Sequence, residues 1–386
     1  MKTSQLYLIT SSTGLLIRLV AAHLIGTIFA YTVYINLASL GDGYEPENFK
    51  GFDEEFGSTV LVHGIYAYLG AFLSGFLAPM VLGLVVAILT WHAFRDVYTK
   101  INPKLFWACN LLPHFLVWSG SSSKEQIVII CGIVIVNFAA KRSFAASRLT
   151  INLIFVFFSL WVIYIIRPNY FVIYLAIFVT SFFFPSSHKI IINRFSVGVW
   201  VFASSLAIMG LTYILSFDAK FISENVVGFM KDVEYSFLAY DGGSNRTNIQ
   251  WNNISDFLYN APWGILQGFI GPTLPEVISR PIQLPVFLEG MVYLYILGYL
   301  FVRLFKLADA SSMLRVHILP YFFVASIIVF ISYPYLIFNT GSALRYKQAM
   351  HPILIFYPLL ILAYARANNL MKTSTKTVSD DASRFF

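Results

Sequence analysis

The residues best able to do chemistry in this 386-residue sequence are charged side chains placed beside long apolar runs. They are Lys124, Glu125, Arg167, Arg345 and Lys347. The first two follow a stretch of small residues after Trp118, between apolar runs at 105–117 and 126–140. Charged groups are costly so close to hydrocarbon, and those that are kept usually have a function.

The four cations in this set suit a phosphate or diphosphate carried by a lipid. Arginine holds such a group through bidentate, charge-assisted hydrogen bonds, whereas lysine acts as a point charge. Arg345 is the strongest candidate, because it stands in a predicted turn with Gly341 and is followed by Tyr346. Arg167 and Lys124 come next, and Lys347 is the weaker one. Each also fits a simpler role, since long basic side chains at helix ends reach for lipid headgroups.

Two carboxylates are candidates for acid–base chemistry. Asp42 lies between Gly41 and Gly43, which let the backbone turn tightly and approach a ligand. It would serve either as a general base or as a ligand of a divalent cation, and no other cofactor is indicated. The alternative is an acidic loop whose charges only keep it in water. Glu125 is the second candidate base.

Aromatic side chains mixed with polar ones suit carbohydrate, because the apolar faces of sugars pack on rings. Tyr44, Trp251 and Tyr346 are the candidates for sugar binding. Trp251 belongs to a long aromatic and polar segment, residues 216–282. An equally simple interpretation is a belt of Trp and Tyr at the membrane interface.

Composition places the chain in a membrane. Hydrophobic residues make up 58% and charged residues only 12%, and the mean hydropathy is +0.71; a soluble domain carries roughly 25% charged residues. A helix needs about 20 apolar residues to cross a bilayer. We expect an all-α bundle of about ten transmembrane helices, at 8–35, 76–93, 105–118, 126–140, 150–166, 170–184, 195–215, 284–305, 316–337 and 351–364.

The charges predict how the helices are oriented. A cytoplasmic N-terminus places 16 of the 26 Lys and Arg residues on the inside, and the short inside loops are then basic, as the positive-inside rule requires. Residues 1–366 then form one membrane domain with outer loops at 38–74 and 216–282, and residues 367–386 form a short polar tail in the cytoplasm. The net charge of +7 faces anionic lipids, and no nucleic-acid motif is present.

Four short motifs carry a resemblance to a known family. They are an acidic residue in the first outer loop, Trp-Ser-Gly followed by Lys-Glu at 118–125, Arg-Pro at 167–168 and Asn-Thr-Gly-x-x-Leu-Arg-Tyr at 339–346. In layout the chain resembles multi-spanning bacterial glycosyltransferases of the GT-C type, and most of all the polymerase-like proteins of O-antigen, capsule and exopolysaccharide synthesis. The resemblance implies a polyprenyl-phosphate or polyprenyl-diphosphate sugar, used on the outer face of the bacterial inner membrane, with membrane lipids and polysaccharide-assembly proteins as partners.

These expectations combine into one mechanism. Asp42, with Glu125 second, would deprotonate an acceptor hydroxyl while Arg345, Arg167, Lys124 and Lys347 stabilise the departing lipid phosphate. One alternative is a GT-C transferase that adds a single sugar from a polyprenyl-phosphate donor. Another is a transporter or flippase of lipid-linked glycans, which would place polar groups in broken helices near the middle of the membrane.

Overall fold

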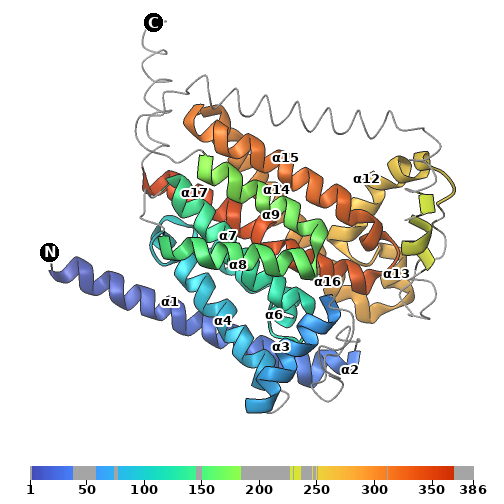
Figure 1. Ribbon diagram of the computed structural model, residues 1–386, viewed down its shortest axis with the longest axis horizontal. Helices are drawn as coiled ribbons and strands as arrows, with labels where there is room; N and C mark the ends of the chain where they lie inside the picture. Colours follow the sequence, from blue (N-terminus) through green and yellow to red (C-terminus); the bar gives the residue numbers. More distant parts are fainter. Residues whose placement is uncertain are drawn as a thin grey trace, which may run out of the picture. The chain divides into compact units, whose positions relative to one another are not determined.

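The computed structural model describes residues 2–37, 58–73, 77–144, 150–183, 227–228, 230–235, 246, 249, 251–310 and 312–368. In this part of the chain the protein is all-α and contains 15 α-helices (Figure 1), which confirms the predicted fold class. Five segments are long and apolar enough to cross a membrane. They are Ser12–Tyr34, Leu77–Phe94, Lys124–Phe144, Pro281–Ala308 and Thr340–Ala367. Shorter apolar helices occur at 60–72, 152–166, 168–181 and 321–330, and the ten predicted spans are not confirmed.

The contacts within the chain divide it into two compact units. Unit 1 comprises residues 1–185, 292–328 and 347–386. Unit 2 comprises residues 186–291 and 329–346. Long helices of the second half of the chain contribute to both units. The predicted membrane domain at 1–366 and polar tail at 367–386 stay a prediction.

Unit 1 is a helix bundle built around α7 (Lys124–Phe144), whose residues are mostly buried. Helix α7 contacts α4 (Leu77–Phe94), α8 (Thr150–Ile166), α9 (Pro168–Phe183) and α17 (Tyr357–Ala367). Helix α1 (Lys2–Phe29) packs on α4 and continues through a π-helical turn, Ala30–Tyr34, into α2 (Ile35–Leu37). Helix α3 (Ser58–Phe72) contacts both α4 and α8. Figure 1 shows α7 and α8 side by side.

The third predicted span, 105–118, is interrupted. Helix α5 (Pro103–Asn110) begins at an Asn102 cap whose side chain accepts from the backbone N–H of Lys104 at 2.9 Å. Helix α6 (Pro113–Ser119) begins at Pro113 and ends at Gly120. Proline lacks an N–H and excludes helical backbone from the residue before it, so Leu112 has ψ 121° and the helix breaks.

Three long helices follow in the second half of the chain. Helices α14 (Leu284–Ala310) and α15 (Ser312–Ile337) pack in unit 1 through Phe301, whose ring centroid lies 5.3 Å from that of Phe322. Helix α16 (Thr340–His351) continues through a π-helical turn, Pro352–Phe356, into α17. The predicted turn at 339–347 is therefore helical from residue 340 onward, which corrects the expected setting of Arg345.

In unit 2, α12 (Ile254–Ile270) packs against the end of α15. The contact is close because a Cβ at Gly264 would lie 2.7 Å from Tyr333, and one at Gly268 would lie 2.6 Å from Leu336. Glycine at these positions lets the helix backbones approach each other. Helix α13 (Leu274–Ser279) and a 3₁₀ turn at Pro281–Gln283 then lead into α14.

One further predicted span agrees with a helix, and one predicted loop does not. The fifth predicted span coincides with α8 at both ends, because its apolar run is bounded by polar residues. The predicted outer loop 38–74 contains the apolar helix α3, so this part of it is not a loop. The predicted span 195–215 lies outside the described residues, as does the tail beyond residue 368.

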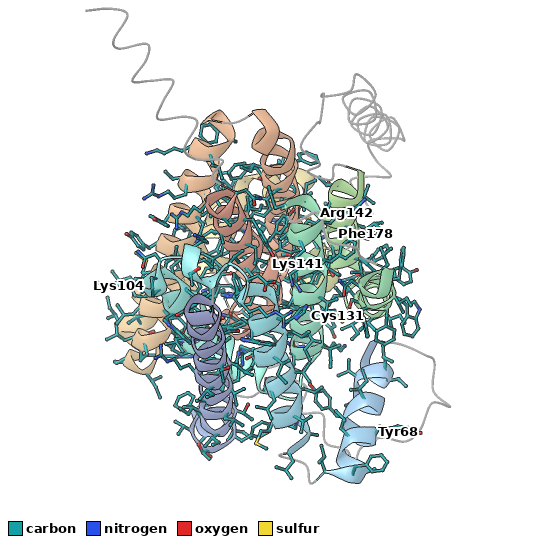
Figure 2. The ribbon with its side chains drawn as sticks, turned by 90° about the vertical axis from the view of Figure 1, so that its left-hand side faces the viewer. Tyr68, Lys104, Cys131, Lys141, Arg142 and Phe178 are labelled. Atoms are coloured by element: carbon teal, nitrogen blue, oxygen red, sulfur yellow. The ribbon has the colours of Figure 1, made fainter. Side chains whose placement is uncertain are left out.

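Basic residues gather at one end of unit 1. Lys141 of α7 donates to the carbonyl of His92 at 3.2 Å and lies 3.7 Å from Asp96, and Arg366 donates to the carbonyl of Lys100 at 3.0 Å. Figure 2 shows Lys141 and Arg142 toward one end of α7, with Tyr68 of α3 toward the opposite end of unit 1. Glu125 starts α7 at the end opposite this basic cluster. Lys124 and Arg167 lie at the Glu125 end, so both ends of α7 carry basic residues. The orientation of the helices in the membrane stays a prediction.

Candidate functional site

The small-residue segment before α7 is a tightly bonded turn. The hydroxyl of Tyr31 accepts from the backbone N–H of Ser122 at 2.9 Å. The hydroxyl of Tyr66 donates to the Gln126 carboxamide at 2.5 Å and accepts from the N–H of Ser123 at 3.1 Å. Tyr31 comes from the π-helical turn that follows α1, and Tyr66 comes from α3, so the turn is held from two sides. It therefore fixes where α7 begins.

Glycines let three helices meet at this turn. A Cβ at Gly26 of α1 would lie 2.7 Å from Leu116 of α6, and one at Gly83 of α4 would lie 3.2 Å from the Thr27 hydroxyl. A Cβ at Gly120 would collide with the same Thr27 hydroxyl. Small residues at helix interfaces allow such close approach in membrane proteins. The run of small residues is thus explained by packing.

Glu125 forms an ion pair with Arg167, and this pair is the centre of the candidate site. Arg167 follows the last residue of α8, and its Nη2 donates to Glu125 Oε1 at 2.5 Å. The Glu125 side chain is completely buried and that of Arg167 is 15% exposed. Removing one partner of a buried pair is costly, typically about 3–5 kcal/mol. Glu125 and Arg167 are predicted to lie on the same membrane surface. They are in direct contact, although 42 residues separate them in the sequence.

Helices α7 and α17 run side by side in parallel. A Cβ at Gly132 would lie 3.1 Å from Pro352, and the rings of Phe144 and Tyr364 stack with centroids 6.2 Å apart. The two contacts are separated by the same number of residues on each helix. Extending the same register back by about one turn places Lys347 near the level of the first turn of α7, where Glu125 lies.

Lys347 is fully buried in unit 1. Its Nζ lies 5.0 Å from the ring centroid of Tyr293, in the range of a cation–π interaction. Sequence reasoning ranked Lys347 below Arg345, yet Lys347 is the more deeply enclosed of the two. A buried ammonium is retained only where carboxylates, dipoles or a ligand compensate for the lost water.

Three cations and one carboxylate gather near the start of α7, namely Lys124, Arg167, Lys347 and Glu125. Arginine and lysine side chains are the groups that bind phosphate in proteins, the first through paired hydrogen bonds and the second as a point charge.

The remaining predicted residues lie in unit 2 or outside the described part. The guanidinium of Arg345 lies 5.8 Å from the ring centroid of Tyr346, and Tyr346 lies 5.8 Å from Tyr335. Asp42 and Tyr44 fall outside the described residues. The described ranges hold no group of three His, Cys, Asp or Glu residues suited to a metal ion, so a divalent cation rests on Asp42 alone and stays a prediction.

Trp251 lies in the interior of unit 2. It is 1% exposed, and its ring centroid lies 5.9 Å from that of Tyr333 and 5.7 Å from that of Phe338. Met230 and Ile249 complete the same hydrophobic cluster. Packing in this core explains why Trp251 is buried. Its ring has no exposed face for a sugar, and its role in sugar binding stays a prediction.

Arg246 is the main charged residue that sequence reasoning missed. It is 6% exposed and pairs bidentately with Glu276, at 2.8 Å from Nε and 3.0 Å from Nη2. It also donates to the carbonyls of Gly271 and Ile337 and to the Thr340 hydroxyl. Partial burial acts to raise the pKa of Glu276, but the hydrogen bonds from Arg246 and Thr273 outweigh it and hold that pKa below its ordinary value. No local pattern around residue 246 signals this role.

Searches against protein-family models, curated proteins and solved structures returned no match to this chain.

Proposed function

We propose that this protein is a membrane glycosyltransferase that joins polyprenyl-linked sugars during the synthesis of a cell-surface polysaccharide. The observation that supports it best is the cationic site at the start of α7. There the buried Glu125–Arg167 pair lies at helix ends, with Lys124 next to Glu125 in the sequence and Lys347 buried in the same unit. A lipid-linked phosphate is an anion delivered within the membrane, so its charge fits this place.

In this proposal each charged residue has a distinct role. Arg167 and the two lysines stabilise the charge that develops on the phosphate as the sugar leaves it, and preorganised charges of this kind usually contribute the largest part of catalysis. Glu125 holds the Arg167 guanidinium in place through the 2.5 Å hydrogen bond. Engagement by a guanidinium makes Glu125 a poor proton acceptor, so we assign it to positioning.

Arg345 and Tyr346 remain proposed phosphate and sugar ligands on α16, and Asp42 remains a proposed base or metal ligand. We place the protein in the bacterial inner membrane with both termini in the cytoplasm. Five apolar segments of spanning length and the clustering of basic residues at one end of unit 1 support a multi-pass arrangement. Lipid-linked glycans and polysaccharide-assembly proteins are the proposed partners.

A charge reversal separates a catalytic pair from a purely structural one. Cells that lack the protein would be complemented with Glu125→Gln, with Arg167→Gln, and with the double variant Glu125→Arg/Arg167→Glu. Glycan chains would be resolved on a gel, and protein level would be measured by immunoblot. Arg303→Gln is the matched control, because Arg303 is exposed and donates to Tyr299 on its own helix at 3.1 Å.

We expect both single variants to lose the polymer ladder and the reversed pair to recover protein level without recovering polymer. Recovery of normal chain lengths by the reversed pair would show that only the ion pair matters, and the catalytic proposal would fail. Loss of one sugar from an otherwise intact polymer would indicate a monosaccharide transferase instead.

A second candidate, transport of lipid-linked glycans, is favoured by the broken helix α5–α6. Broken helices with buried polar groups form the central sites of many transporters, and His23 is buried within the first long apolar segment. A transporter predicts that lipid-linked units accumulate on the cytoplasmic leaflet when the protein is missing. The transferase predicts that they accumulate on the opposite leaflet, so leaflet-specific labelling decides between the two.

A further inference from the structure

The end of α16 carries three polar side chains that are completely buried. Lys347, Gln348 and His351 each have no exposed surface. Lys347 and His351 are four residues apart, so they lie on one face of the helix, one turn from each other. Tyr293 joins them, because its ring lies 5.0 Å from the Lys347 ammonium and 5.9 Å from the His351 ring centroid. The three side chains therefore share one location in unit 1.

His351 lies in an aromatic enclosure. Its ring stacks on Phe115 of α6 with centroids 4.2 Å apart and meets the edge of Phe356 at 4.8 Å. The Cys109 carbonyl faces the ring, yet neither ring nitrogen makes a hydrogen bond of ordinary geometry with a described residue. Both polar atoms of the Gln348 carboxamide are likewise buried without such a bond. Buried polar groups are nearly always satisfied, so these atoms point to a ligand or to water.

The helix facing His351 is the short helix α6, and two π-helical turns contact it. Tyr34, at the end of the π-helical turn of α1, packs against His114 and Trp118 with centroids 5.7 and 6.5 Å apart. Phe356, at the end of the other, packs against Phe115 at 5.5 Å. π-Helical turns occur frequently at functional sites, where they redirect a few side chains. Two π-helical turns pack against the broken helix α5–α6 here, which favours a functional site over simple core packing.

We propose that His351, in place of Asp42, accepts the proton of the acceptor hydroxyl in the transfer reaction, with Gln348 hydrogen-bonding the acceptor sugar beside it. This inference rests on the proposed transferase function. The hydroxyl oxygen bonds to the anomeric carbon of the lipid-linked sugar, and the bond from that carbon to the phosphate oxygen breaks. The bonding electrons leave with the phosphate, and the hydroxyl proton moves to a ring nitrogen of His351.

The geometry supports this assignment over Glu125, whose Oε1 is engaged by Arg167 at 2.5 Å. An imidazole has a lone pair for a proton when neutral, and histidine is the commonest general base in enzymes. Lys347, one turn away, would attract the leaving phosphate while His351 handles the proton. The charged and titratable groups that face His351 from its own and neighbouring elements are Lys347, Tyr293 and the backbone of Cys109.

The competing explanation is that His351 only fills an aromatic enclosure, and three variants separate the two. His351→Phe keeps an aromatic ring, His351→Gln keeps polarity without a base, and His351→Ala leaves a ring-sized space. His92→Gln is the matched control, because His92 is a partly exposed histidine of unit 1 that lies beside Lys141. The full-length protein would be reconstituted in vesicles with lipid-linked oligosaccharide extracted from cells lacking it, and initial rates of chain extension would be measured from pH 5 to 9.

We expect all three His351 variants to lose about 100-fold or more in rate, the usual contribution of a general base, and His92→Gln to stay within twofold of wild type. Added imidazole should restore the Ala variant, while benzene, which matches the ring in size but has no nitrogen, should not. Activity of His351→Phe within twofold of wild type would overturn the base assignment and leave the transferase proposal standing.

The wild-type protein sets the reference rate for these variants. A wild-type protein that extends no chain at any pH would instead overturn the transferase function itself.

Discussion

Replacing Arg246 by Met would test how unit 2 is held together. The Arg246 guanidinium pairs with Glu276 and donates to the Gly271 and Ile337 carbonyls and the Thr340 hydroxyl, at 2.8 to 3.1 Å. Methionine has a similar apolar stem but no donor. The variant leaves the Glu276 carboxylate without its cation and leaves two carbonyls without partners.

The cost follows from burial. Removing one partner of a fully buried ion pair costs about 3–5 kcal/mol in the free energy of unfolding. The Glu276 side chain is 27% exposed, so water partly screens its charge and we expect roughly 2–4 kcal/mol for Arg246→Met. Glu276→Gln should cost less, about 1–2 kcal/mol, because its amide oxygen still accepts from Arg246.

Thermal unfolding of the purified protein in detergent measures this effect. Each kcal/mol lowers the unfolding temperature by roughly 2–4 °C for a domain of 150–250 residues, so a drop of several degrees is expected. Arg303→Met is the control, because Arg303 is exposed. A shift for Arg246→Met no larger than that of Arg303→Met would refute the reasoning.

The same pair should make stability depend on pH. The pKa of Glu276 lies below its ordinary value of 4.5 in the folded protein, despite partial burial, because Arg246 and Thr273 bond its charged form. A depressed folded pKa means that the contribution is fully present above the unfolded value and is lost as the pH falls through the folded value. Unfolding temperatures below pH 4.5 should therefore fall less in Glu276→Gln than in wild type.

Three further outcomes are expected from packing. Gly120→Ala should lower the yield of folded protein, because the new Cβ collides with the Thr27 hydroxyl, and adding Thr27→Ala should restore part of it, as fluorescence-detected size exclusion would show. Trp251→Ala should cost about 3–5 kcal/mol in thermal unfolding, since the ring is 1% exposed; a near-neutral result would mean that unit 2 is not packed around it. Tyr66→Phe should cost about 1–3 kcal/mol by leaving the buried Gln126 carboxamide oxygen without its 2.5 Å donor, and the same melting assay would contradict this if the variant matched wild type.

Much of the fold could be predicted because hydropathy is a local property. The apolar run at 150–166 becomes α8 with the predicted ends, whereas the span predicted at 105–118 is broken before Pro113 into α5 and α6. The loop predicted at 38–74 contains α3, which is apolar but has only 15 residues. A helix of that length is short for a membrane span, and the prediction therefore missed it. The membrane class and most helix positions therefore needed no tertiary information.

The site depended on the tertiary structure. The sequence by itself showed that Glu125, Arg167 and Lys347 stand at the ends of apolar runs, where charges are costly. Only packing decided that Glu125 meets Arg167, that Lys347 is enclosed beside Tyr293, and that Trp251 belongs to a core. The physical reason is that hydropathy is summed along the chain, whereas the partner of a charge depends on how helices rotate and slide against one another, which close contacts such as that of Gly132 with Pro352 determine.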